Sequence, residues 1–177
     1  MTTTTNDTIA RPGRDETAEY YFRYIDLVPE GDIRDILTAQ RHDTIALLDS
    51  IPESLADHRY APKKWSVREV LSHINDCERV FTMRAFWFAR EMDTPLPSFE
   101  SDMCVQTARS AEHPWTAHVH EHAAIRASTL ALFNNLPAVG WSGRGIASDM
   151  PFTVRALAYI TAGHLIHHTR VLTEKYL

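Results

Sequence analysis

The segment Lys64-Trp-Ser-Val-Arg-Glu-Val-Leu-Ser-His-Ile-Asn-Asp76 contains the clearest local signal for secondary structure in this chain. Ser66 and Glu69 have the spacing of a capping box, in which each side chain satisfies a backbone N–H at the start of a helix. Apolar residues then recur every three or four positions, until Asp93-Thr-Pro-Leu-Pro97 breaks the pattern. The sequence therefore predicts a long amphipathic helix over residues 66–90.

The same period of three to four residues indicates three more helices. They are expected at about residues 32–51, 115–136 and 153–176. No segment shows the sustained alternation between hairpin turns that is typical of strands, so we expect an all-α fold. About 24 residues separate the second helix from the third, which is more than antiparallel neighbours in a bundle need. The pattern predicts a four-helix bundle with a long crossover between helices 2 and 3.

Composition indicates one globular domain with an ample core. The chain has 177 residues, of which 44% are hydrophobic, and we find no internal repeat. Residues 1–15 are rich in Thr and polar, so we expect a mobile N-terminal arm followed by a single domain over residues 16–177.

Charge and cysteine content exclude several classes of function. A formal net charge of -5 offers no general attraction to nucleic acid or to an anionic membrane, so neither is an expected partner. Cys77 and Cys104 are too few for a disulfide framework, and Cys77 is expected to be a small buried hydrophobic residue. No secretory signal or membrane-spanning run occurs, so we expect a cytoplasmic protein.

The ten histidines are the most informative polar residues. His164 and His168 fall at the centre of the apolar stripe of the last helix, four positions apart, so both imidazoles project from one face. This spacing lets a helix offer two nitrogens to one metal ion. His73 lies at the margin of the stripe over residues 66–90. A hydrogen-bonded structural role remains an alternative for all three.

Other polar residues also fall on inward stripes. Arg126 lies near the centre of the stripe over residues 115–136, and the first helix carries Gln40 and Thr44. Burying such groups unpaired costs about 1–3 kcal/mol for each neutral group, so they must satisfy one another or surround a ligand. Arg126 fits either a structural ion pair or a substrate anchor, and Gln40 and Thr44 fit polar lining. By contrast, His118 and His122 lie at the edge of their stripe and predict a solvated face.

Two segments together carry a family resemblance. Lys64-Trp-Ser-Val-Arg-Glu-Val-Leu-Ser-His-Ile-Asn-Asp-Cys-Glu-Arg79 and Arg155-Ala-Leu-Ala-Tyr-Ile-Thr-Ala-Gly-His-Leu-Ile-His-His168 resemble the DinB-like superfamily of metal-binding four-helix bundles. The resemblance extends from about Glu19 to the C-terminus. It implies an up-down-down-up bundle.

The same resemblance implies a set of site residues. His73, His164 and His168 would be the ligands of a divalent metal, typically zinc or nickel, with an open coordination position. Asp76 also fits the family pattern and would be a carboxylate that either supports a metal ligand or acts in the active site.

Known members of that family include S-transferases and isomerases that use low-molecular-weight thiols, and others are described as metal-dependent hydrolases. We therefore expect a metalloenzyme in which a divalent ion activates a low-molecular-weight thiol or a water. Asp76 and Arg126 would serve catalysis, with Gln40, Thr44 and Arg126 lining the site of a small-molecule substrate. A homodimer is also expected from the resemblance. The alternative is a non-catalytic bundle that binds a metal or another ligand.

Overall fold

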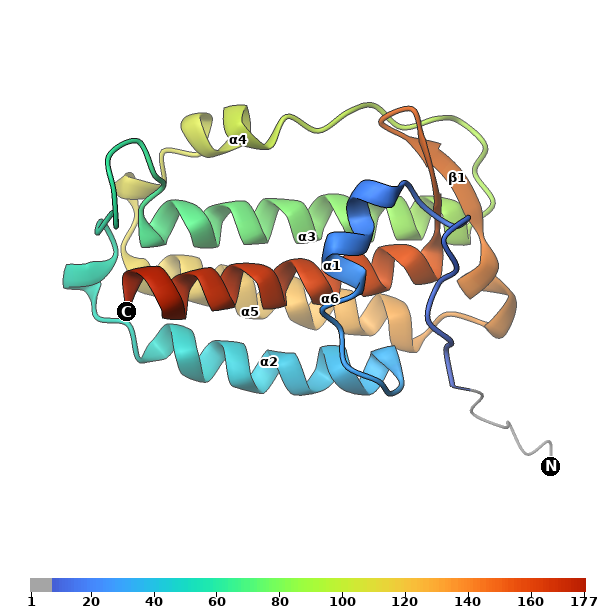
Figure 1. Ribbon diagram of the computed structural model, residues 1–177, viewed down its shortest axis with the longest axis horizontal. Coiled ribbons are helices and arrows are strands. Elements are labelled where there is room, and N and C mark those ends of the chain that lie inside the picture. The colour runs from blue at the N-terminus through green and yellow to red at the C-terminus, as the bar shows by residue number, and fades with distance from the viewer. Residues whose placement is uncertain (1–7) are drawn as a thin grey trace.

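The structure is a computed structural model that describes residues 8–177. Four long helices lie side by side (Figure 1). They are α2 (Ile33–Asp49), α3 (Val67–Ala89), α5 (Trp115–Asn134) and α6 (Val154–Val171). Helix α3 packs against both α5 and α6, and α2 packs against the same two helices. The prediction of a four-helix bundle is therefore confirmed.

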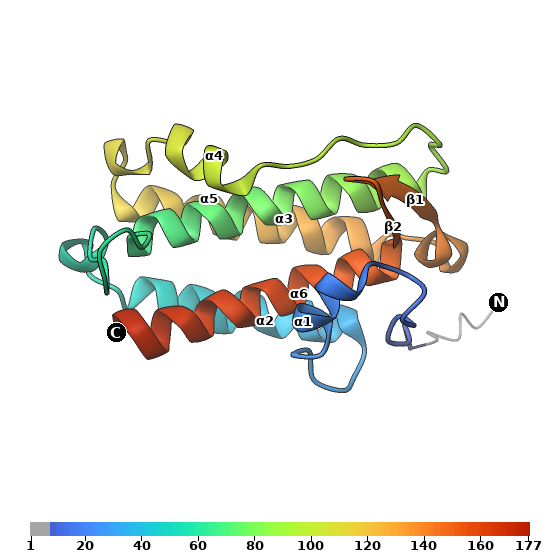
Figure 2. The same ribbon diagram turned by 45° about the horizontal axis from the view of Figure 1, so that its top comes forward.

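Shorter elements connect and cover the four helices. They are η1 (Glu19–Tyr21), α1 (Phe22–Ile25), η2 (Glu53–Leu55), α4 (Ser101–Thr107), η3 (Ser110–Glu112), η4 (Ala138–Ser142) and the terminal π-helix η5 (Leu172–Tyr176). Helix α1 packs against α6. The connection from α3 to α5 runs back along α3 and carries α4, as Figures 1 and 2 show.

A two-stranded hairpin corrects the all-α prediction. Strands β1 (Arg144–Ala147) and β2 (Met150–Thr153) pair antiparallel. The two turn residues, Ser148 and Asp149, both have positive φ, at 52° and 58°, which is the backbone of a tight hairpin turn. Such turns usually contain Gly or Asn, and each strand has only four residues, so the sequence lacks the usual hairpin signal.

Side-chain caps explain where the long helices begin. The Ser66 hydroxyl accepts a hydrogen bond from the Glu69 backbone N–H (3.3 Å), and the Glu69 carboxylate accepts one from the Ser66 N–H (2.7 Å), so the predicted capping box is present. Asp32 caps α2 by accepting from the Arg34 N–H, and Thr153 caps α6 in the same way. These bonds satisfy backbone donors that a helix start leaves unpaired.

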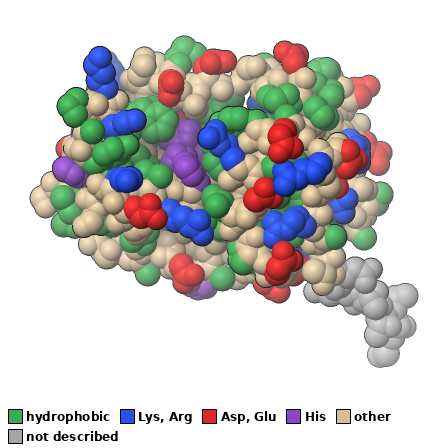
Figure 3. Space-filling view, viewed as in Figure 1, with side chains coloured by type: hydrophobic (Ala, Val, Ile, Leu, Met, Phe, Trp, Pro, Cys, Tyr) green, Lys and Arg blue, Asp and Glu red, His purple; other side chains and the backbone are tan. Residues whose placement is uncertain are grey.

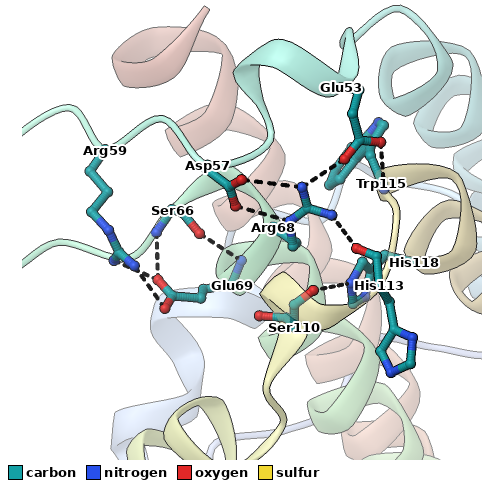
Figure 4. Close-up of polar contacts among 10 residues, drawn as sticks. All are labelled: Glu53, Asp57, Arg59, Ser66, Arg68, Glu69, Ser110, His113, Trp115 and His118. Carbon is teal, nitrogen blue, oxygen red and sulfur yellow. Dashed lines mark hydrogen bonds and ion pairs between the residues drawn. The ribbon is translucent and has the colours of Figure 1, made fainter.

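A buried arginine joins the start of α3 to the start of α5 (Figure 4). Arg68 donates to Glu53 (2.7 Å), to Asp57 (3.0 Å) and to the carbonyl oxygen of His113. Glu53 in turn accepts from the backbone N–H of Trp115 (2.7 Å). This network connects η2, α3 and α5 at one end of the bundle.

The N-terminal segment is tied to the bundle from residue 8 onward. Arg11 donates to the carbonyl oxygens of Ile25 and Val28, at 2.7 Å each, and Glu16 accepts from Thr153 and from Arg155. Residues 1–7 of the expected mobile arm lie outside the described residues, and the boundary expected at residue 15 stays a prediction. Among the helices described, none is long and apolar enough to cross a membrane.

Candidate metal centre

Three buried side chains from α3 and α6 bring metal-ligating atoms together. His73 and Cys77 lie one turn apart on α3, and His164 faces them from α6. His73 Nε2 lies 3.1 Å from His164 Nε2, and Cys77 Sγ lies 3.7 Å from the His73 ring nitrogens. The candidate ligand atoms of the three residues all lie within 4.8 Å of one another. We call His73, Cys77 and His164 the His/Cys cluster.

His168 lies beside this cluster. Its ring centroid is 4.8 Å from that of His73 and 4.4 Å from that of His164. The structure thus brings the rings of all three histidines of the predicted triad next to one another, with Cys77 as an additional neighbour. The sequence contained a signal for Cys77, because it follows His73 at the same spacing of four that separates His164 from His168.

Burial keeps these histidines neutral at pH 7. Desolvation lowers the pKa of His73 to about 4 and that of His168 to about 3, and it places the pKa of His164 well below its ordinary value. A neutral imidazole keeps one nitrogen lone pair free, which metal binding requires. Burial also raises the pKa of the Cys77 thiol, so this group stays protonated unless a nearby cation stabilises the thiolate.

The donor set fits a divalent ion such as zinc. Two nitrogens that bind one tetrahedral zinc at about 2.0–2.1 Å lie about 3.3 Å from each other. The separation of 3.1 Å between His73 Nε2 and His164 Nε2 is close to that value. Imidazole nitrogen with cysteine sulfur is a donor combination that suits zinc and other late transition metals.

Aromatic rings enclose the cluster. Tyr24 of α1 lies edge-on to His164, with ring centroids 5.2 Å apart, and Trp65 lies 4.7 Å from the His73 ring. Gly163 allows this close approach of α1, because a Cβ there would lie only 2.5 Å from the Tyr24 carbonyl carbon. The packing of α1 on α6 therefore positions Tyr24 over the candidate ligands.

Two cavities reach the histidines from different sides. One of about 160 Å³ is lined by the His/Cys cluster, and another of about 290 Å³ is lined by His167 and His168. Figure 3 shows histidine side chains reaching the surface beside α3. A small molecule can therefore approach the candidate ligands without opening the bundle.

The structure places Asp76 in a separate ion-pair group. This half-buried carboxylate pairs with Arg79 (3.5 Å), and Arg79 also contacts Glu121 of α5 (2.7 Å). Burial raises the pKa of Asp76 above its ordinary value. The His/Cys cluster does not include Asp76, and its expected part in catalysis stays a prediction.

Arg126 lies in a buried polar network between α2, α3 and α5. It donates to Glu78 (2.8 Å) and to Gln40 (3.1 Å), and Thr129 donates to the other carboxylate oxygen of Glu78 (2.7 Å). Gln40 also donates to the backbone carbonyl of α6 at residue 162 (3.0 Å). Thr44 is buried on α2. Arg126 thus pairs with Gln40 and with Glu78, while its Nε has no hydrogen-bond partner among residues 8–177.

The solvated face predicted for His118 and His122 is wrong. His118 is 7% exposed and its Nε2 lies 2.8 Å from the carbonyl oxygen of Ser110, while His122 is fully buried with its Nδ1 3.0 Å from the Asn75 side-chain oxygen. The crossover between α3 and α5 supplies Ser110, and α3 supplies Asn75. Both cover a part of α5 whose own pattern indicated exposure.

Comparison with known proteins identifies the family. The sequence profile of the DinB superfamily matches residues 36–172. The fold is similar to that of YfiT from Bacillus subtilis, described as a probable metal-dependent hydrolase with an unusual four-helix bundle topology. That match has a TM-score of 0.67 and 15% identity, and it covers 93% of this chain and 90% of that one.

A mycothiol-dependent maleylpyruvate isomerase also has a similar fold. The match has a TM-score of 0.66 and 10% identity, and it covers 77% of this chain and 58% of that one. No curated protein sequence is significantly similar to this chain. Because the family profile matches well over half of its length, the chain belongs to the DinB superfamily.

Proposed function

We propose that this protein is a metal-dependent enzyme that acts on a small molecule. In this proposal a divalent ion, zinc or nickel, is held by His73, His164 and His168. The observation that carries the proposal is the pair of buried Nε2 atoms of His73 and His164, 3.1 Å apart on different helices. Neutral imidazoles at that separation are suited to share one cation.

The bound ion would lower the pKa of a coordinated thiol or water and so supply a nucleophile at neutral pH. The protein's own contribution is to orient the imidazoles and to limit access of bulk water. Tyr24 and Trp65 pack against His164 and His73 and hold their rings in place. We propose a low-molecular-weight thiol or a water as the activated group, and the two structural neighbours support one alternative each.

We further propose roles for the predicted polar residues. Asp76 would transfer a proton, and the direction of its pKa shift supports this, because burial raises the pKa of the carboxyl group and so favours its protonated form. Arg126, Gln40 and Thr44 would support the substrate site from the side of α2 and α5.

The finer architecture belongs to the same proposal. We propose an up-down-down-up bundle, which the colour gradient along α2, α3, α5 and α6 in Figure 1 supports. A cytoplasmic homodimer also remains a proposal. Light scattering coupled to chromatography tests the dimer, and a monomer mass would contradict it.

The first experiment is elemental analysis of untagged protein purified without chelator. The wild type should contain about one divalent ion per chain, and His73→Ala and His164→Ala should lose it while circular dichroism shows unchanged helicity. His120→Ala, at an exposed position of α5, is the matched control and should retain the metal. Unchanged metal content in His164→Ala, or no metal even after reconstitution, would contradict the proposal.

Two further variants identify the third ligand. His168→Ala should lose most of the metal and Cys77→Ser should retain it, if the three histidines are the ligands. The reverse result would assign the third position to Cys77.

Turnover separates an enzyme from a metal-binding bundle without activity. The wild type is assayed with a panel of cellular thiols and electrophiles and, in parallel, with ester and amide substrates. A rate that exceeds that of the free ion and disappears in His164→Ala supports catalysis. Bound metal without such a rate would favour the non-catalytic bundle.

A further inference from the structure

Three arginine side chains are buried in the described part of the chain, and one of them differs from the other two. Arg68 is 4% exposed and pairs with Glu53 and Asp57, and Arg126 is fully buried and pairs with Glu78. Arg84 of α3 is 2% exposed, yet no carboxylate within residues 8–177 forms an ion pair with it.

The contacts of Arg84 leave part of its guanidinium unused. Its Nη2 donates to the carbonyl oxygen of Pro97 (3.1 Å) and to the hydroxyl of Ser148 (2.9 Å). Its Nε is buried and has no hydrogen-bond partner in the region that the structure describes, a condition that it shares with Arg126 Nε. The nearest ring face is that of Phe152, 5.7 Å from the guanidinium carbon. The Tyr21 hydroxyl also interacts with the guanidinium. Neutral oxygens and aromatic rings thus surround a full positive charge.

Arg84 lines the cavity of the His/Cys cluster. The same cavity of about 160 Å³ is bounded by His73, Cys77 and His164 and by Tyr21. Burial lowers the pKa of Arg84, which reflects the cost of keeping the cation in this enclosed position. A buried cation is stable when an anion with good geometry compensates it. Among residues 8–177, no carboxylate compensates the cation in this cavity.

We propose that Arg84 binds a carboxylate group carried by the small molecule that reacts at the His/Cys cluster. A guanidinium recognises a carboxylate through its N–H donors, and Nη2 of Arg84 already donates to Pro97 and Ser148, so Nη1 is the donor left for a ligand. The cavity holds the volume of about five water molecules, enough for a carboxylate on a short carbon chain. The substrate class is therefore small carboxylates, or thiols that carry a carboxylate.

That the bound molecule reacts rests on the proposed function, whereas the binding of a carboxylate by Arg84 is tested separately. Full-length protein, with its metal content measured, is unfolded thermally in sodium acetate and in sodium chloride at equal ionic strength. Acetate should raise the unfolding midpoint of the wild type, because a ligand that binds only the native state stabilises it. The rise should disappear in Arg84→Met. Arg90→Met, which removes an exposed charge from the end of the same helix, should behave as the wild type.

A second measurement links the carboxylate to the metal. Protein loaded with cobalt(II) is titrated with mercaptoacetate and with uncharged 2-mercaptoethanol, and binding is followed by the thiolate-to-cobalt charge-transfer absorption. The wild type should prefer mercaptoacetate by about tenfold or more, since hydrogen bonds between charged groups are stronger than neutral ones. Arg84→Met should lose this preference and keep its affinity for 2-mercaptoethanol. Arg84→Lys keeps the positive charge but not the planar guanidinium, so it should retain part of the preference for mercaptoacetate.

The outcomes distinguish the two proposals. If cobalt does not bind but acetate stabilises the wild type and not Arg84→Met, the metal-dependent function fails and the carboxylate site stands. If cobalt binds while acetate has no effect, or an equal effect on Arg84→Met, the carboxylate site is overturned. The inference does not depend on the folding of Arg84→Met. If acetate does not raise the unfolding midpoint of the wild type, the carboxylate site is overturned whatever the variant does.

Discussion

Replacing Gly163 by Ala tests the packing that holds α1 against the candidate metal centre. A Cβ at residue 163 would lie 2.5 Å from the Tyr24 carbonyl carbon and closer still to its oxygen, whereas ordinary contacts begin near 3.4 Å. The neighbour is backbone, which cannot rotate away, so α1 must move by at least about 0.9 Å. Tyr24 would then leave its position against His164.

The expected loss of stability follows from two opposing effects. Overpacking of a well-packed interior costs about 1–3 kcal/mol, and the upper part of this range applies because backbone meets backbone. Alanine in place of glycine returns about 1 kcal/mol through its better helix propensity. The net cost is about 2 kcal/mol, which lowers the unfolding midpoint by about 4–8 °C for a domain of this size.

The assay is thermal and urea unfolding followed by circular dichroism, with Gly140→Ala as the control. A Cβ at Gly140 would meet only the side chains of Leu136 and Pro137, at 3.5 Å or more, so its midpoint should stay near that of the wild type. Displacement of α1 should also make the buried Cys77 react faster with a thiol reagent. An unchanged midpoint and unchanged thiol reactivity for Gly163→Ala would refute the close approach of α1 to α6.

Two further predictions concern buried charge and proton binding. Arg126→Met leaves the Glu78 carboxylate buried without its partner and should lower the free energy of unfolding by about 3–5 kcal/mol. Arg79→Met breaks a partly exposed ion pair and should lower it by about 1 kcal/mol or less. Equal losses of the two variants in urea unfolding would contradict this prediction. Because burial lowers the pKa of His73 and of His122 to about 4, the unfolded chain binds more protons below pH 6.5, and stability should fall as the pH drops from 6.5 toward 4. Each of these histidines changes the free energy of unfolding by up to about 1.4 kcal/mol per pH unit. The stability of His122→Gln should therefore decline less steeply with falling pH than that of the wild type. A free energy of unfolding that does not change with pH in this range would exclude neutral buried imidazoles.

Local sequence patterns determined much of the bundle. The capping box of Ser66 and Glu69 marks the start of α3, and apolar residues at helical spacing mark the four long helices. These signals are readable because each depends on residues less than two turns apart. The spacing of His164 and His168 likewise predicted two imidazoles on one face, and their rings lie 4.4 Å apart.

Features that depend on a partner residue from another helix, strand or loop could not be predicted from the sequence in this way. The hairpin of β1 and β2 turns at Ser148 and Asp149, which both have positive φ. Neither residue is a glycine, so the sequence does not indicate this backbone conformation. His118 and His122 sit at the edge of an apolar stripe, and their burial is due to Ser110 and Asn75, which come from other parts of the chain.

The sequence by itself determined which residues form helices and which face of each helix is apolar, because both properties arise from neighbours along the chain. Only the tertiary structure decided that Cys77 lies beside His73 and His164 and that Arg126 pairs with Glu78. It also decided that Arg84 has no carboxylate partner among residues 8–177. Those outcomes depend on which helix faces which, at what depth and in what register. The free energy of a buried charge is set by the groups that surround it in space, and helical spacing does not specify them.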